Sequence, residues 1–245
     1  MIRGAVGKPL DHDPDFRWRG EAVTRIENLS DIAFALALGM IISSAAPLAT
    51  YRDLTGFMLL ILPTAAAFAV TLQIWTYHYT FFRRYGVADR TIIVLNAVLI
   101  FLVLFMAYPL RFTFISLFAW ILGQGGQLTT SSPDILLGVR TLQEAAKTIA
   151  IFAVFYGLIF AIYALMYGHV LRKAALLDLD QSETTTTRAT RLGMWLSSTV
   201  AFLVALLAIT TPIGPASGFL LTLQRPIQLM AARIQRRRGA GPSHS

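Results

Sequence analysis

The sequence predicts an all-α membrane protein with six transmembrane helices, and three observations lead to this fold class. Hydrophobic residues make up 56% of the 245 positions, charged residues only 14%, and the mean hydropathy is +0.61. A soluble domain would carry about 25% charged residues. Apolar runs close to the ~20 residues that cross a bilayer recur along the chain. The positive charges are also divided unevenly between the connecting segments, which is typical of a membrane protein rather than a large soluble helical one.

Six apolar runs are the candidate spans. They cover residues 29–48, 54–82, 91–110, 148–167, 192–211 and 213–230. The sixth is the shortest, because the charged and helix-breaking segment 224–226 interrupts it. Residues 112–122 are apolar but too short to span, and they predict either an interfacial or re-entrant segment or a continuation of the third helix beyond Pro109. The polar segment 178–187 is expected to be flexible.

The distribution of Lys and Arg predicts the orientation. With the N-terminus in the cytoplasm, 17 of the 21 basic residues fall in cytoplasmic segments, and the exceptions are Arg52, Arg111, Arg140 and Lys147. Cytoplasmic loops carry this excess of positive charge, and five spans would leave the basic cluster 233–238 outside. We therefore expect a multi-pass protein of the cell membrane, with a cytoplasmic tail at 1–20, a six-helix domain at 21–235 and a basic cytoplasmic tail at 236–245.

Several classes of function are disfavoured by what the chain contains. The net charge of +8 follows from topology and from attraction to anionic lipid headgroups, so it does not predict nucleic-acid binding. Cysteine is absent, and the four histidines are scattered, with no zinc-protease or nucleophile-elbow motif. An enzyme is therefore not expected, and neither is a bound metal or cofactor. A secondary transporter and a non-conducting membrane anchor or sensor remain alternatives to a channel.

The first span carries a polar pair, Ser30 and Asp31, close to its start. An N-cap would explain the pair, but Thr24 and Glu27 already fit a capping box, which places the helix start near Thr24. Ionisable groups within a span cost roughly 2.5–3.5 kcal/mol near its centre and therefore need a partner. Asp31 lies six residues after Arg25, about 240° around one helix, so we expect these two to pair only across helices or subunits.

Two other polar residues share this depth. Asp31, His78 and Asn96 each lie roughly 7–11 Å inward from the cytoplasmic boundary, at 1.5 Å per helical residue. Three polar side chains from three helices in one layer predict a hydrogen-bonded cluster, with His78 as a structural residue. In the first helix, Leu36, Met40 and Ser43 form a stripe that either faces lipid, packs against another helix or lines a pore. The small pairs Ala33/Ala37 and Ala35/Gly39 permit close helix contact.

Residues 25–31 (RIENLSD) resemble the Arg-x-x-x-Phe-Ser-Asp signature that opens the first helix of the transmembrane protein 175 family of potassium channels. Trp75, His78 and Phe81 in the second span, and Asn96 and Pro109 in the third, are similar to the pattern of that family. The likeness covers residues 21–110 with recognisable motifs, and beyond Arg111 it rests on the number of spans.

The resemblance implies a homotetramer whose first helices line a central pore with an apolar constriction. It implies that the pore conducts potassium and, in some members, other monovalent cations, without a TVGYG filter. On this basis Leu36, Met40 and Ser43 line the pore, with the constriction at Leu36. A structural network of Arg25, Ser30, Asp31, Trp75, His78 and Asn96 would hold the pore helix. The family Phe is Leu29 here, and a Thr linked to potassium preference is Gly39, which implies only modest selectivity for potassium over sodium.

Overall fold

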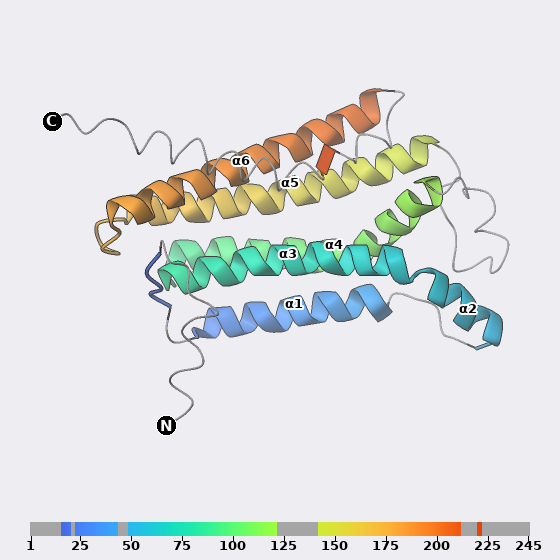
Figure 1. Cartoon of the computed structure of the whole chain (residues 1–245), viewed down its shortest axis with the longest axis horizontal. Coiled ribbons are helices and arrows are strands. Elements are labelled where there is room, and N and C mark those ends of the chain that lie inside the picture. Colours follow the sequence, from blue (N-terminus) through green and yellow to red (C-terminus); the bar gives the residue numbers. More distant parts are fainter. Residues whose placement is uncertain (1–15, 21–22, 44–48, 122–141, 212–219, 222–245) are drawn as a thin grey trace.

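The structure, a computed structural model, describes residues 16–20, 23–43, 49–121, 142–211 and 220–221. Long helices lie roughly side by side and a short one extends from one end (Figure 1). The α-helices of these residues are α1 (Arg25–Ser43), α2 (Tyr51–Leu59), α3 (Ile61–Tyr85), α4 (Arg90–Ile121), α5 (Leu142–Arg172) and α6 (Gln181–Thr210). The predicted all-helical class is confirmed for this part of the chain.

Four helices, α1, α4, α5 and α6, are long and apolar enough to cross a membrane. The number becomes five when α2 and α3, which meet at 50°, are taken as one broken span. These helices match the first five predicted spans. The sixth predicted span, 213–230, lies almost wholly outside the described residues, so six crossings stay a prediction.

The second predicted span differs from a single straight helix. A capping box between Thr50 and Asp53 starts α2, which ends at Leu59. The N–H of Leu60 then bonds to the carbonyl of Phe57, three residues back, at 3.1 Å. Pro63 has no N–H for the carbonyl of Leu59, so the regular hydrogen-bond ladder cannot continue through this point. The chain bends here and α3 carries on as a separate helix.

Two segments that the sequence left open or misjudged are helical. α4 continues through Pro109 to Ile121, so the segment after Pro109 extends the third helix instead of forming a re-entrant piece within the described residues. α6 begins at Gln181, which shows that the expectation of a flexible 178–187 was wrong. Asp180 and Glu183 form a capping box there. Within this helix Thr185 and Thr187 donate their hydroxyls to the carbonyls of Gln181 and Glu183, one turn back, so these side chains find acceptors inside the helix.

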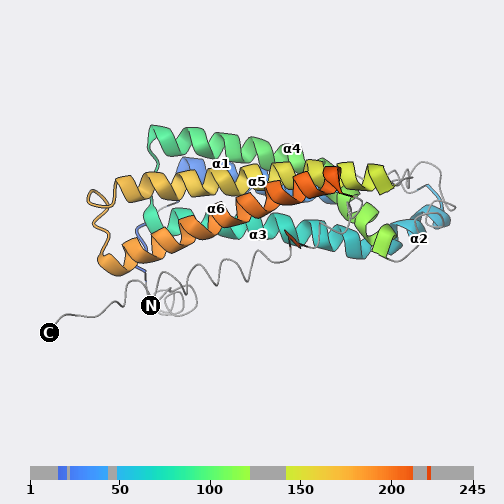
Figure 2. The ribbon, with the colours of Figure 1, turned by 90° about the horizontal axis from the view of Figure 1, so that it is seen from above.

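The packing order leaves one face of α1 uncovered. α5 and α6 run along each other, α4 lies beside α5, and α1 packs on α3 and α4 (Figure 2). On the packed side of α1, Phe34, Ala37 and Ile41 are fully or almost fully buried. Ala33 and Ala37 give this side the small surface that a close approach needs. The opposite side of α1 meets no other helix of the described protomer.

Charged groups gather at one end of the bundle, which we call the basic end. It holds the α3–α4 turn (86–89), the α5–α6 connection (173–180) and the N-terminal segment 16–20. Gly86 makes the turn after α3 in the left-handed conformation (φ 60°), which glycine adopts without strain. The N–H of Gly20 donates to the carbonyl of Arg83 (3.1 Å), and Phe16 packs edge-on against Tyr85. The segment 16–20 is therefore docked on the bundle.

Candidate functional site: the exposed face of α1 and the polar cluster behind it

The exposed face of α1 is an apolar stripe along the helix. Leu29, Ile32 and Leu36 are 60%, 67% and 55% exposed, and Gly39 and Ser43 continue the stripe toward the end of the helix. Steps of three and four residues keep these positions within one side of a 3.6-residue helix. The stripe is about 21 Å long at 1.5 Å per residue. It has the length and the apolar character of a surface that must meet lipid, another subunit or a dewetted pore.

The three residues predicted to form the stripe, Leu36, Met40 and Ser43, are not equally exposed. Leu36 and Ser43 are exposed, whereas Met40 is only partly exposed and packs against the core. Ile32, which the sequence reasoning missed, lies near the centre of the exposed face. Extending the stripe backward from Leu36 by one turn would have found it.

Behind this face, a chain of hydrogen bonds joins α3, α4 and α1. Asn96 lies between His78 and Ser30, with its Oδ1 at 3.0 Å from Nε2 of His78 and its Nδ2 at 2.8 Å from Oγ of Ser30. Ser30 donates its own hydroxyl to the carbonyl of Ile26 (2.8 Å) and therefore accepts from Asn96. All three side chains are at most 1% exposed. Asn96, Ser30 and Nε2 of His78 thus satisfy one another across the three helices.

The direction of this chain assigns the tautomer of His78. Since Asn96 donates to Ser30, its oxygen faces His78, and Nε2 of His78 must carry the proton that it donates. The imidazole lies between the rings of Phe34 and Phe82, at centroid distances of 5.5 and 4.6 Å. Nδ1 has no hydrogen-bond partner among the described residues. A ring-packed histidine of this kind orients helices, and among the described residues no group binds its Nδ1.

A second contact holds the start of α1 to α3. The indole Nε1 of Trp75 donates to Oδ1 of Asp31 (2.9 Å), and the Trp75 ring stacks on Tyr79 at 5.5 Å. The predicted capping box is confirmed, because Glu27 N donates to Thr24 Oγ1 (3.2 Å) and Thr24 N donates to Glu27 Oε2 (3.3 Å).

Arg25 is the one predicted network residue that these bonds do not reach. It is exposed, and within the described chain no hydrogen bond or ion pair involves its side chain. The buried Glu27 pairs with Arg83 instead, with Oε1 at 3.8 Å from Nε. The sequence reasoning did not include this pair, although both residues lie at the same predicted boundary.

Two acidic residues, Glu183 and Asp89, tie the basic end together. Arg19 binds both carboxylate oxygens of Glu183, at 2.9 and 2.6 Å. Asp89 accepts from Nε2 of His169 and from Nζ of Lys173, each at 2.6 Å. Partial burial alone would raise the pKa of Asp89, but the bonds from Lys173, the N–H of Ile92 and His169 outweigh it and hold this pKa well below its usual range.

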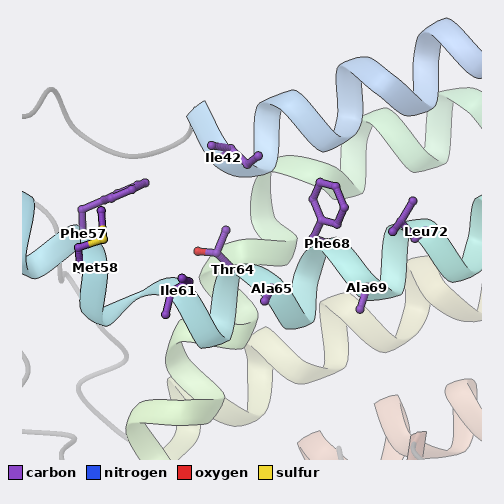
Figure 3. Close-up of a pocket in the computed structure, with 9 residues that line it drawn as sticks. All are labelled: Ile42, Phe57, Met58, Ile61, Thr64, Ala65, Phe68, Ala69 and Leu72. Atoms are coloured by element: carbon purple, nitrogen blue, oxygen red, sulfur yellow. The ribbon is translucent and has the colours of Figure 1, made fainter.

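An apolar groove lies at the end of α1 farthest from the basic end (Figure 3). It has a volume of about 380 Å³. Its lining comes from the last turn of α1, from α2 and from the first half of α3: Ile42, Phe57, Met58, Ile61, Thr64, Ala65, Phe68, Ala69 and Leu72. None of these described residues is charged, so the groove offers apolar surface.

Comparisons with known proteins agree with this geometry. A curated relative from Marivirga tractuosa, named "Potassium channel", is 33% identical over 233 residues, which is 91% of each chain. A solved structure of a variant of the potassium channel MtTMEM175, in complex with a nanobody–MBP fusion protein, matches with a TM-score of 0.75 and 29% identity. That match covers 92% of this chain and 99% of the other. The chain belongs to the transmembrane protein 175 family. No protein-family model matches the sequence.

Membership of the transmembrane protein 175 family confirms the resemblance found in residues 25–31 and extends it. The motif-based likeness ended near residue 110, whereas both comparisons cover more than nine-tenths of the chain. Both related proteins are named as potassium channels and neither as an enzyme. The chain is therefore a membrane protein of a channel family and not of an enzyme family.

Proposed function

We propose that the chain is one subunit of a potassium-permeable cation channel whose central pore is lined by α1 from several copies. The observation that carries this proposal is the exposed apolar face of α1, which meets no other helix among the described residues of its own protomer. The family relatives are named potassium channels, which supports the same ion for this chain. An assembly that turns these faces inward would enclose a narrow apolar pathway.

The proposed constriction is Leu36. It lies midway along the exposed stripe, with Ile32 one turn before it and Ser43 about two turns after it. A ring of leucine side chains would gate by dewetting, because a narrow apolar passage holds water poorly. Met40, which is partly packed against the core, would contribute its remaining exposed surface to the lining. Ser43 would place hydroxyls at the wider end.

The polar cluster has a supporting role in this proposal. Ser30, His78 and Asn96 hold α1 from its buried side, and Trp75 holds it through Asp31. These bonds set the rotation of α1 about its axis, which decides whether Leu36 faces the pore. Arg25 would act between subunits, since it has no partner within the described protomer.

Selectivity should be modest. At Gly39, a Cβ would meet no atom within 4 Å, so this position faces open space and offers no hydroxyl to a passing ion. We infer a homotetramer in the cell membrane with both termini in the cytoplasm. The family resemblance supports the tetramer. The basic end supports the orientation. Arg111 lies past the middle of α4 and Lys147 near the start of α5, both away from the basic end, whereas Arg83 and Arg84 are in the last turn of α3 at that end.

Bilayer recording tests the proposal. Purified protein is reconstituted with potassium and sodium salts on opposite sides, and the current and its reversal potential are measured. We expect a cation current whose reversal potential is shifted from zero toward the potassium equilibrium potential but stays well short of it. A flat recording from folded, reconstituted protein would overturn the channel, and countertransport of a substrate would indicate a transporter instead.

The constriction has its own test. Leu36→Asn replaces the apolar ring with polar side chains, which should increase the conductance because water then occupies the passage. Leu206→Asn on α6 is the matched control, since Leu206 has the same exposed fraction of 55% but lies on another helix. An unchanged current in Leu36→Asn, with equal amounts of protein in the bilayer, would refute the assignment of Leu36 to the pore.

A further inference from the structure

The docked segment 16–20, which we call the N-terminal strap, has no task in the channel proposal. It lies at the basic end of the bundle, beside the end of α3 (Figure 1). It also precedes α1 closely in the chain, since only residues 21–24 separate it from Arg25, the first residue of that helix. The strap therefore stands between the helix proposed to line the pore and the rest of the basic end.

Two buried glutamates, Glu27 on α1 and Glu183 on α6, lie at the starts of their helices. Each is the third residue of its helix and closes a capping box, Glu27 with Thr24 and Glu183 with Asp180. Their exposed fractions are only 5% and 1%. A buried carboxylate is strongly destabilising when it lacks a charged partner. Each of these helix starts therefore depends on a cation from another part of the fold.

An arginine from outside each helix supplies that cation. Arg19 of the strap binds both carboxylate oxygens of Glu183, and its Nη2 also donates to the carbonyl of Asp178 at 2.7 Å. In the last turn of α3, Nε of Arg83 lies 3.8 Å from Oε1 of Glu27. Within the described part of the chain, these are the ion pairs that the two glutamates make.

The strap and the end of α3 are joined through their backbones. The N–H of Gly20 donates to the carbonyl of Arg83 at 3.1 Å, and Nη1 of Arg83 donates to the carbonyl of Gly20 at 2.9 Å. A Cβ on Gly20 would lie 2.4 Å from the carbonyl oxygen of Phe82, so this close approach requires glycine. At the other end of the strap, Phe16 is buried and packs edge-on against Tyr85. The position of the strap therefore depends on that of Arg83.

These contacts form one continuous path from α6 to α1. In order, it runs through Glu183, Arg19, Gly20, Arg83 and Glu27. The path matters because the main packing partners of α1 are α3 and α4, whereas α6 packs mainly on α5. Side-chain packing alone therefore connects the starts of α1 and α6 only indirectly, and the strap adds a direct connection at the basic end.

We propose that the N-terminal strap positions the start of α1 by linking it to the start of α6, with Arg19 and Arg83 as positioning residues. This inference rests on the proposed function, because it takes α1 as the pore helix. Leu29, the first residue of the exposed stripe, follows Glu27 by two residues, and Leu36 follows it by two and a half turns. A displacement of the helix start therefore displaces the constriction, and loosening the strap changes how often the constriction conducts.

Glutamine variants test the link without any current. Glu27→Gln and Glu183→Gln remove the charge but keep a residue that suits a capping box. Thermal unfolding of the purified full chain in detergent is measured for each variant and for the double variant. The two glutamates share no direct bond among the described contacts, so independent effects would add. We expect the double variant to lose clearly less than the sum of the single losses, and an additive loss would overturn the link.

Trypsin tests the docking of the strap. The enzyme cleaves after Arg17 and Arg19, and mass spectrometry of the digested full chain measures the rate at these sites. Glu183→Gln should raise this rate severalfold, because the strap then leaves the bundle more often. Asp89→Asn is the matched control, since Asp89 makes its ion pairs at the same end of the bundle but not with the strap. Equal cleavage rates in the variant and the control would overturn the proposal.

Bilayer recording tests the positioning of α1. Arg19→Gln should change the open probability severalfold, whereas Asp89→Asn should leave it unchanged. Arg19→Lys should have a smaller effect than Arg19→Gln, because lysine keeps the charge but not the two-pronged bond, and it is the test variant if Arg19→Gln fails to fold. The reversal potential should stay the same throughout, since the strap does not line the pore.

The outcomes separate this inference from the channel proposal. If the original protein conducts and the variants of Arg19 leave the open probability unchanged, the positioning role is overturned while the channel stands. A flat recording from the original protein would refute the proposed function together with the positioning role. The unfolding and cleavage measurements would then still decide whether the strap links α6 to α1.

Discussion

The bond between Asn96 and Ser30 should be measurable as an energetic coupling between α4 and α1. The perturbation is a double-mutant cycle of Ser30→Ala and Asn96→Ala, which isolates the pairwise energy from the cost of each truncation. The two side chains are joined at 2.8 Å and are at most 1% exposed, so water does not replace the lost bond.

The magnitude follows from these contacts. Hydrogen bonds between membrane helices contribute about 0.6 kcal/mol on average and up to about 1.7 kcal/mol. Asn96→Ala also leaves Nε2 of His78 without its partner, and an unsatisfied buried group costs roughly 1–3 kcal/mol. We therefore expect Asn96→Ala alone to destabilise by about 2–4 kcal/mol, with a Ser30–Asn96 coupling of about 1 kcal/mol. Ser30→Ala alone should destabilise the protein less than Asn96→Ala, since Nε2 of His78 then keeps its bond to Asn96.

Equilibrium unfolding in mixed detergent micelles, at fixed protein concentration, measures these energies. Ser30 and Ser198 form the control pair. Ser198 is also buried, but it donates to the carbonyl of Gly157 on α5 at 2.9 Å, away from α1. Ser30→Ala and Ser198→Ala should be additive. A Ser30–Asn96 coupling no larger than that of the control pair would show that the cluster does not join the helices energetically.

Two further predictions concern the pore and the basic end. Gly39→Thr should move the reversal potential toward the equilibrium potential of potassium, because it adds a hydroxyl where the position faces open space. Gly39→Val is the control, since valine has the shape of threonine but no hydroxyl, and it should leave the reversal potential unchanged. Equal reversal potentials in the two variants would contradict the selectivity argument. The low pKa of Asp89 means that its stabilisation is present above the unfolded-state pKa, about 4, and is lost as the pH falls through the lower folded-state value. Asp89→Asn should therefore lower the unfolding temperature at pH 7, and the unfolding temperature of the variant should fall less steeply as the pH is lowered. If the unfolding temperatures of the variant and the original protein fall equally steeply below pH 4, the prediction is wrong.

The sequence was sufficient for features that depend on position along one helix. The apolar runs indicated the described helices that can span a membrane, and the capping box of Thr24 and Glu27 indicated the start of α1. The rise per residue placed Asp31, His78 and Asn96 at one depth. Residues 25–31 were enough to indicate the family.

Local hydrogen bonding decided several boundaries that hydropathy could not. The break before α3 lies where Leu60 bonds three residues back and Pro63 lacks an N–H. The start of α6 has a capping box, and its Glu183 also binds Arg19 of the docked N-terminal segment. A run of threonines appears flexible by composition alone. Its hydroxyls become compatible with a helix once a docked segment and a capping box hold the first turn.

The depth of a side chain was therefore determined by the sequence, and its neighbours were decided only by the tertiary structure. Rise per residue sets depth, and it is the same in every helix. Which faces meet depends on how the helices rotate and pack, which involves residues far apart in the chain. This is why the sequence predicted a polar layer but not that Asn96 joins His78 to Ser30, and why it included Met40 in the stripe on α1 and missed Ile32.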